Sequence, residues 1–221
     1  MIKKYENLLN LEATIAKALF DKYDHPWEVL PHIKEYILKI IPTLGEEYIK
    51  INDEVYAHKT AKISKMAEIN GPTIIGKNTE IRHCAFIRGS AIIGENCVIG
   101  NSTEVKNAII FDNCQCPHYN YVGDAILGHY AHTGAGVILS NVKSDKTNIV
   151  LNIEGEKCET NLRKFSAILG NRVEVGCNSV LCPGTIVGEN TNIYPLTRVR
   201  GIIKNNMIVK DMNNIIEKEV R

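Results

Sequence analysis

The chain has 221 residues, a net charge of +1 at pH 7 and a hydrophobic fraction of 44%. This length suits one sizeable core, or one domain with an appendage, and the even mixture of acids and bases argues against a nucleic-acid or membrane partner. The first residues contain no unbroken apolar stretch, and no later run is long enough to span a bilayer. We therefore expect a cytoplasmic protein. None of its seven cysteines forms a C-x-x-C pair, so they are expected to be reduced thiols that serve packing.

Residues 1–50 carry apolar side chains at helical spacing. They form two series: Leu8, Leu11, Ile15 and Leu19, then Leu30, Ile33, Ile37 and Ile40. Two amphipathic helices are predicted, joined near Pro26 and ended at Pro42. This helical hairpin is either a recognition or oligomerisation element or a cap over the first turn of the repeat that follows. The general need of repeat proteins for terminal caps favours the cap.

Residues 51–204 place an aliphatic residue at every sixth position. The first run is Ala57, Ile63, Ile69, Ile75, Ile81, Ile87, Ile93, Ile99 and Val105; Leu127, Thr133 and Leu139 keep the step; the last run is Leu169, Val175, Leu181, Val187, Ile193 and Val199. A period of six suits neither a helix nor a plain strand, but it suits short strands joined by tight corners. Such repeats resemble the left-handed parallel β-helix, an all-β solenoid in which three hexapeptides complete a coil and the aliphatic residue points inward. A right-handed solenoid is the alternative, with coils that are usually longer and less regular.

Two stretches interrupt this repeat. Between residues 106 and 128 the step from Val105 does not arrive at Leu127, and we interpret the break as the means by which His118 and Tyr121 project from the wall. Residues 141–164 are polar and are expected to leave the solenoid as an inserted loop, in part as a small hairpin. The tail, residues 205–221, is expected to form a short closing helix.

The motifs around the first break carry a family resemblance. EVKN, PHYNYVGDA and GAG followed by an asparagine resemble the acetyltransferase domain of the bifunctional N-acetylglucosamine-1-phosphate uridyltransferases, over residues 55–202. The inserted segment and its NLRK ending are closer to the archaeal-type sugar-1-phosphate nucleotidylyltransferase/acetyltransferases. The Gly-rich nucleotide-binding start of that family is not found before the repeat, so uridyl transfer is not expected.

The resemblance implies three groups of ligand-binding residues. A cationic pocket of Arg88, Lys106 and Lys164 would hold the phosphate of the acceptor. The sugar contacts would come from Tyr121, Asn141 and His132, the last of which replaces an asparagine of the bacterial family. The acetyl-CoA channel would be lined by Ala135, Gly136 and Cys177.

Transfer of an acetyl group from a thioester to a sugar amine also requires a base near neutral pKa. His118 is the candidate, and Glu104 is placed to orient or polarise it. A backbone N–H would stabilise the oxyanion, and because the amine attacks acetyl-CoA directly, Cys116 is not assigned as a nucleophile. His129 and His132 form an H-x-x-H pattern, but a solenoid coil does not bring that spacing to one face, so no metal is expected.

These observations leave several functions open. The leading hypothesis is an acetyl-CoA-dependent N-acetyltransferase of glucosamine 1-phosphate or galactosamine 1-phosphate, assembled as a homotrimer with its site between subunits. An amino-sugar nucleotide is another possible acceptor. The alternative from a different class is a non-catalytic module that binds sugar phosphates or assembles with a separate nucleotidyltransferase chain.

Overall fold

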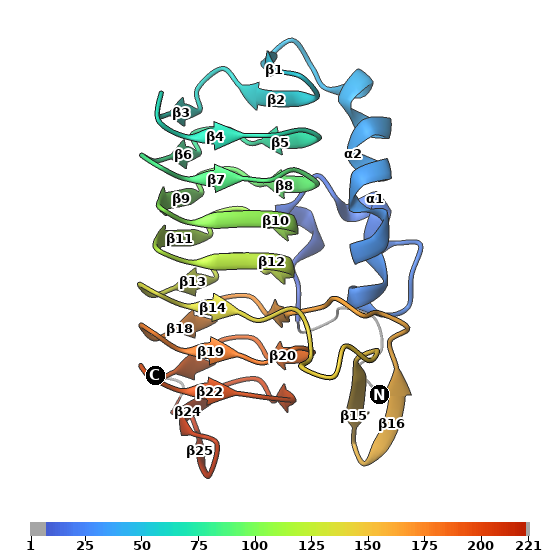
Figure 1. The fold of residues 1–221 in the computed structure, drawn as a ribbon, viewed down its shortest axis with the longest axis vertical. Helices are drawn as coiled ribbons and strands as arrows, with labels where there is room; N and C mark the ends of the chain where they lie inside the picture. The colour runs from blue at the N-terminus through green and yellow to red at the C-terminus, as the bar shows by residue number, and fades with distance from the viewer. Residues whose placement is uncertain (1–7, 220–221) are drawn as a thin grey trace.

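The computed structural model describes residues 8–219, so the first seven residues of the expected helical hairpin and the last two of the tail lie outside the described residues. The fold is the expected left-handed parallel β-helix, with its coils stacked along the long axis of the molecule (Figure 1). None of the helices within residues 8–219 is long and apolar enough to cross a membrane.

Each coil has three sides, and strands on one side pair in parallel with the strands above and below. The first side contains β2 (Val55–His58), β5 (Thr73–Ile75), β8 (Ala91–Ile93), the second halves of β10 (Glu104–Ile110) and β12 (Tyr121–Leu127), β17 (Ala167–Leu169), β20 (Thr185–Val187) and β23 (Ile202–Ile203). The second side contains β3 (Lys62–Ile63), β6 (Glu80–Ile81), β9 (Val98–Asn101), β11 (Gln115–His118), β13 (His132–Thr133), β18 (Glu174–Val175), β21 (Asn192–Ile193) and β24 (Met207–Asp211). The third side contains β4 (Glu68–Ile69), β7 (Phe86–Ile87), the first halves of β10 and β12, β14 (Ile138–Leu139), β19 (Val180–Leu181) and β22 (Arg198–Val199).

The inward residues of successive coils stack on one another and form the core. Ile75, Ile87 and Ile99, one from each side of the coil, are all fully buried. Ile75 pairs with Ile93, 18 residues further on, as three hexapeptides require. From Ile93 the next partner is Ile110, only 17 residues away, so this coil lacks one residue.

Two shortened sides account for the break in the repeat. The steps that begin at Val105 and at Val122 reach the next inward residue after five positions, whereas the steps between them keep six. The shortened corners turn at Asn107 and Asp124, whose φ angles of 46° and 51° lie in the left-handed region. The prediction that the break lets His118 and Tyr121 project from the wall is wrong, because both lie in the step from Cys116 to Val122, which keeps six residues.

The N-terminal segment lies along the first side of the solenoid and does not cap its end. Its described residues, from Leu8 onward, form three 3-10 helices and two short α-helices: η1 (Leu11–Ala13), α1 (Lys17–Phe20), η2 (Pro26–His32), α2 (Ile33–Ile40) and η3 (Ile41–Thr43). The α2 helix contacts β8 and β10, and η2 contacts β12 (Figure 1). The expectation of a cap over the first coil is therefore wrong.

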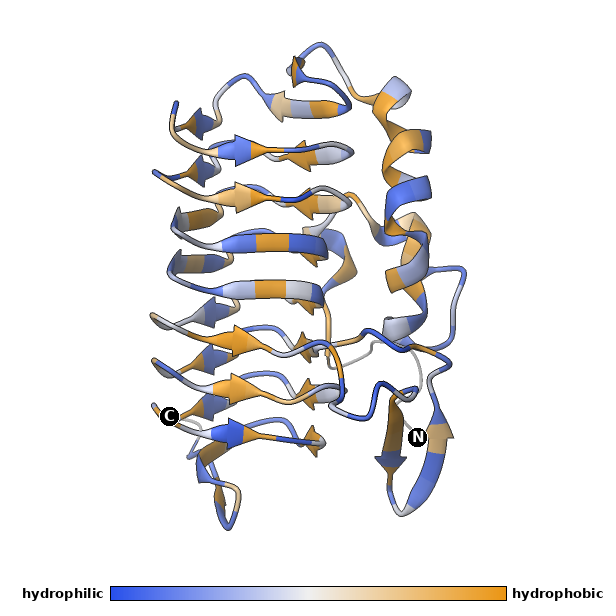
Figure 2. Ribbon diagram, viewed as in Figure 1, coloured by the Kyte–Doolittle hydropathy of each residue, from blue (hydrophilic) through white to orange (hydrophobic). Residues whose placement is uncertain are grey.

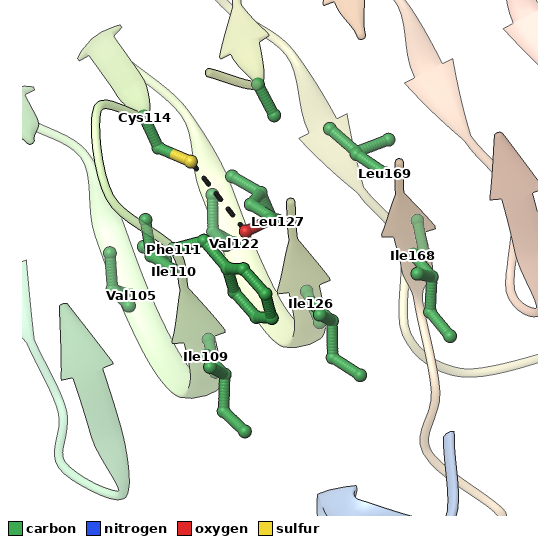
Figure 3. Packing of buried hydrophobic residues seen from close by; sticks show 14 of the residues in the cluster. Val105, Ile109, Ile110, Phe111, Cys114, Val122, Ile126, Leu127, Ile168 and Leu169 are labelled. Atoms are coloured by element: carbon green, nitrogen blue, oxygen red, sulfur yellow. Dashed lines mark hydrogen bonds between the residues drawn. The ribbon is translucent and has the colours of Figure 1, made fainter. Parts of the chain in front are cut away.

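A row of outward isoleucines explains this position. On the first side, the residue before the inward aliphatic is a buried isoleucine in six strands: Ile74, Ile92, Ile109, Ile126, Ile168 and Ile186. Figure 3 shows three of them pointing away from the interior side chains. Figure 2 shows hydrophobic residues on the first-side strands and on the helical segment beside them. Apolar surface on both partners drives the segment onto this side.

Strands cover both ends of the solenoid. At the first coil, β1 (Tyr48–Asn52) pairs antiparallel with the outer edge of β2. At the last coil, β25 (Asn214–Glu217) folds back antiparallel onto β24. The predicted closing helix is therefore wrong: Asn213 and its neighbours make a turn, and the hairpin satisfies backbone groups that an open edge would expose.

The inserted loop leaves and re-enters the solenoid at one point. The backbone N–H of Phe165 donates to the carbonyl of Asn141 at 3.1 Å, which closes the base of residues 141–164. Within the insertion, β15 (Val150–Ile153) and β16 (Glu156–Glu159) form an antiparallel hairpin. The coil can therefore continue past the insertion, and Leu127 stacks directly on Leu169.

We predict that Ile87→Asp lowers the free energy of unfolding by roughly 3–5 kcal/mol, because the carboxylate would be buried without a partner. Ile49→Asp is the control, since the Ile49 side chain on β1 is 47% exposed, and it should cost about 1 kcal/mol or less. Chemical denaturation measures both values. Equal unfolding midpoints for Ile87→Asp and the parent would contradict the inward position of Ile87.

Candidate functional site

A buried carboxylate organises the corner between the third and first sides. Asp124 is 4% exposed, and its Oδ1 accepts a hydrogen bond from Asn107 Nδ2 at 2.9 Å. Its Oδ2 accepts from Asn141 Nδ2 at 2.5 Å and lies 3.4 Å from Lys106 Nζ. A buried carboxylate is stable only when it is paired and hydrogen-bonded, and these three donors meet that need. Of the residues expected to bind the acceptor, the structure thus brings Lys106 and Asn141 to one carboxylate.

The same amide connects Tyr121 to this group. Asn141 Nδ2 also donates to the hydroxyl of Tyr121 at 3.1 Å. Gly123 leaves room for the phenol, because a Cβ atom there would lie 2.4 Å from the Tyr121 hydroxyl oxygen. Burial is the main reason that the pKa of Tyr121 is raised, so its hydroxyl stays protonated and can both donate and accept hydrogen bonds.

Arg88 and Glu104 form an ion pair on the third side, in the two coils that precede the coil of Tyr121. Arg88 Nη1 donates to Glu104 Oε1 at 2.7 Å, on side chains that are partly exposed. The sequence predicts that Glu104 orients His118. No hydrogen bond joins these two side chains in the part of the chain that the structure describes, and the Glu104 carboxylate is instead occupied by Arg88. The proposed orienting role of Glu104 is therefore not supported within one chain.

A pocket of about 410 Å³ opens beside Asp124. It is lined by the following residues: Leu30, Pro31, Asn107, Asp124, Leu162, Arg163 and Lys164. Lys164 was expected in the phosphate site, and it lies here at the end of the insertion. Arg163 adds a second cation next to it. Arg163 and Lys164 can bind an anionic group, and the polar side chains of Asn107 and Asp124 can bind hydroxyl groups. The pocket therefore suits an anionic, polyhydroxylated molecule.

His118 lies at the neighbouring corner, between the second and third sides. Its side chain is exposed at the end of β11, and its carbonyl accepts from the backbone N–H of Gly136 at 3.0 Å. The carbonyl of Ala135 in turn accepts from the backbone N–H of Asn178 at 2.8 Å, beside the exposed Cys177. His118 and the three residues expected to bind acetyl-CoA therefore occupy successive coils of one corner. Within one chain they lie at the other end of the third side from Asp124.

The H-x-x-H histidines have separate partners. His132 Nδ1 is 2.7 Å from Glu174 Oε2 on the next coil. His129 Nε2 is 2.9 Å from Asn113 Nδ2, and burial is the main cause that lowers its pKa. His132 thus lies on the second side, away from the other expected sugar contacts. Within residues 8–219, no group of three or more His, Cys, Asp and Glu side chains is arranged to hold a metal ion.

Asp124, Asn107 and Arg163 were not identified from the sequence. Asn107 and Asp124 could have been found by counting the residues between successive inward positions, because each lies in a step of five residues where the repeat has six. The side chains of successive corners are in contact here, as the Asn107–Asp124 hydrogen bond shows, just as Asn78 and Asn96 are at full-length corners. Arg163 adjoins the identified Lys164, and its position depends on the path of the insertion.

We predict that Asp124→Asn lowers the free energy of unfolding by about 1–3 kcal/mol, because an amide cannot accept at both positions and leaves a buried donor unpaired. The control is Asp53→Asn, which removes an exposed ion pair with Lys50 and should cost about 0–1 kcal/mol. Thermal and chemical denaturation give the comparison. Equal costs for the two variants would show that Asp124 does not organise this corner.

A second prediction concerns the thiol of Cys116. Cys116 is fully buried, and burial raises its pKa to about 12, so almost no thiolate is present at neutral pH. We expect iodoacetamide to modify the exposed Cys84 readily and Cys116 only after denaturation, as read by mass spectrometry of peptides. Prompt modification of Cys116 in the folded protein would reopen the question of a nucleophilic role.

The chain is similar in sequence to several known proteins. GlmU, a bifunctional protein of Methanococcus maripaludis strain S2, is 32% identical over 195 residues, which cover 87% of this chain and 47% of the relative. GlmU of Methanocaldococcus jannaschii is 32% identical over 123 residues, with coverages of 56% and 30%. A bifunctional sugar-1-phosphate nucleotidylyltransferase/acetyltransferase of Sulfurisphaera tokodaii is 34% identical over 97 residues, with coverages of 44% and 24%.

These matches confirm the resemblance that the motifs indicated, including the closeness to archaeal proteins. The chain spans about half the length, or less, of these curated relatives. A family model described as the GMPPB C-terminal domain matches residues 71–220. Because this match extends over more than half of the chain, the protein belongs to the family of the GMPPB C-terminal domain.

Proposed function

We propose that the protein is an acetyl-CoA-dependent N-acetyltransferase that acts on an amino-sugar 1-phosphate, with glucosamine 1-phosphate or galactosamine 1-phosphate as the acceptor. The observation that carries this proposal is the group of Lys106, Tyr121 and Asn141 around Asp124, beside the pocket of Lys164. Its similarity to GlmU and to a sugar-1-phosphate nucleotidylyltransferase/acetyltransferase supports the same reaction class.

The proposed acceptor site divides its contacts by chemistry. Lys164 and Lys106 attract the phosphate, and Arg88 can join them when it exchanges Glu104 for a more strongly charged partner. The Tyr121 hydroxyl, which accepts from Asn141, keeps its hydrogen to donate, and the Asn141 amide keeps its oxygen to accept, so the two suit the hydroxyl groups of a sugar ring. Asp124 holds Lys106 and Asn141 in place, so it acts as a positioning residue.

His118 supplies the proposed base. It takes a proton from the amine as the amine nitrogen attacks the thioester carbonyl, and a backbone N–H stabilises the resulting oxyanion. Collapse of this intermediate forms the amide and breaks the carbon–sulfur bond, so that coenzyme A leaves and takes up a proton as a thiol. The corner of Ala135, Gly136 and Cys177, stacked on His118, gives acetyl-CoA a continuous edge along which to bind.

A homotrimer would unite the two halves of the site. His118 precedes the third side of its coil and Asp124 follows it, so one copy's His118 can complete the Asp124 corner of a neighbouring copy. Ile138 and Val180 are outward residues of the third side, 38% and 37% exposed, and they offer apolar surface for such packing.

A non-catalytic module is the second candidate. It is favoured by the partner of Glu104, which is Arg88 and not His118. Such a module would bind the sugar phosphate through Lys106 and Lys164 and assemble with a separate nucleotidyltransferase chain.

One assay separates the two candidates. The protein is incubated with acetyl-CoA and either glucosamine 1-phosphate, galactosamine 1-phosphate or an amino-sugar nucleotide, and free thiol is followed with time. Glucose 1-phosphate, which has no amine, is the control. Thiol release with one of the amino-sugar phosphates is the expected result. Binding of these compounds without thiol release would support the non-catalytic module.

Steady-state kinetics test the role of His118. His118→Ala should lower kcat by about 10²–10⁴-fold, the usual contribution of a positioned base. His83→Ala is the matched control, because His83 is exposed at the same corner two coils earlier and should leave kcat unchanged. Circular dichroism verifies folding. Full turnover in folded His118→Ala would remove the assignment of this residue as the base.

The same measurements distinguish Lys106 from His118. Lys106→Ala should raise KM for the phosphorylated sugar with a smaller effect on kcat, as expected when binding is lost equally in the ground and transition states. KM for acetyl-CoA should change little. A large loss of kcat at unchanged KM would place Lys106 in the chemical step and not in phosphate binding.

A further inference from the structure

The N-terminal segment supplies part of the pocket wall. Leu30 and Pro31 of η2 line the pocket together with Asp124 of the β-helix and with Arg163 and Lys164 at the end of the insertion. Three segments that are far apart in the sequence therefore meet at one cavity. The apolar part of the lining comes from the N-terminal segment and from Leu162, whereas the cations come from the insertion.

This wall is fixed by packing. Leu30 is 2% exposed and η2 contacts β12, the strand that contains Asp124. Trp27, one helical turn before Leu30, is buried and stacks on Phe165 with ring centroids 6.3 Å apart. Phe165 directly follows Lys164, so the aromatic contact couples the wall to the segment before β17 that bears the cations. Pro31 itself is exposed at the rim of the pocket.

We propose that the N-terminal segment is a component of the acceptor site, in which Pro31 and Leu30 form the wall that faces the phosphate held by Arg163 and Lys164. The inference rests on the proposed function for the identity of the acceptor, a sugar phosphate monoester. An apolar wall displaces water from beside the cations and so strengthens their attraction for a dianion. The segment thereby contributes to acceptor affinity and selects for a phosphate over an uncharged group.

Charge substitutions at the rim test this proposal without disturbing the buried Leu30. Pro31→Glu places a carboxylate beside the two cations and should raise the Kd for glucosamine 1-phosphate by about five-fold or more, as a surface charge contribution of about 1 kcal/mol predicts. Pro31→Lys should lower that Kd or leave it equal, and both effects should shrink at high salt. Isothermal titration calorimetry, with galactosamine 1-phosphate as a second ligand, gives the values.

Lys34→Glu is the matched control. Lys34 is exposed on the following helix and does not line the pocket, yet this substitution changes the net charge by more than Pro31→Glu does. It should leave the Kd nearly unchanged. Equal Kd values for Pro31→Glu and Lys34→Glu, in variants with parental melting temperatures, would overturn the proposal. So would failure of the parent protein to bind either sugar phosphate.

The outcomes separate this inference from the proposed reaction. If Pro31→Glu weakens binding while the parent releases no thiol from acetyl-CoA, the wall is supported and the acetyltransferase reaction is not. If the parent transfers acetyl groups and Pro31→Glu has the parental Kd and KM, the reaction is supported and the wall is overturned.

Discussion

Each side of a coil in this β-helix sends two side chains into the interior, such as Ala85 and Ile87, and the rest of the structure depends on that constraint. Ile87 stacks between Ile69 and Val105, and every coil must present its inward residue at the same place. A residue can therefore be lost or gained only at a corner. The coils that contain Asn107 and Asp124 each have one residue fewer at a corner. The next coil carries the whole insertion at a corner, and Leu127 still stacks on Leu169.

The site arises where these changes coincide. A shortened corner turns through one residue in the left-handed region, which Asn and Asp tolerate better than most side chains. Their side chains then meet outside the coil, and Asn141 at the base of the insertion donates to the same carboxylate. Because Asp124 is buried, it needs every one of these donors. The arrangement that stabilises its charge also holds Lys106 and Asn141 in fixed positions.

The β-helix could be predicted because its period depends on inward residues that are close in sequence. The expected binding residues Lys106, Tyr121 and Asn141 come together, since the motifs that contain them keep their spacing. Other features depend on contacts that no local pattern records. The partner of Glu104 depends on Arg88 in the previous coil, and the pocket depends on where the insertion returns. The tail alternates apolar and polar residues as a β-hairpin does, but each strand is so short that the pattern does not distinguish a strand from a helix.

The outward isoleucines of the first side explain why the N-terminal segment belongs to the site as well as to the fold. A cap would need to cover only one coil, and β1 already does so. The row from Ile74 to Ile168 extends along many coils, so only a segment parallel to the axis can bury it. Such a segment must pass the corner of Asp124, since Ile126 lies two residues beyond that carboxylate on the same strand. The wall of the pocket is therefore a consequence of the core: a chain that buries this row brings apolar side chains to the edge of the cationic corner.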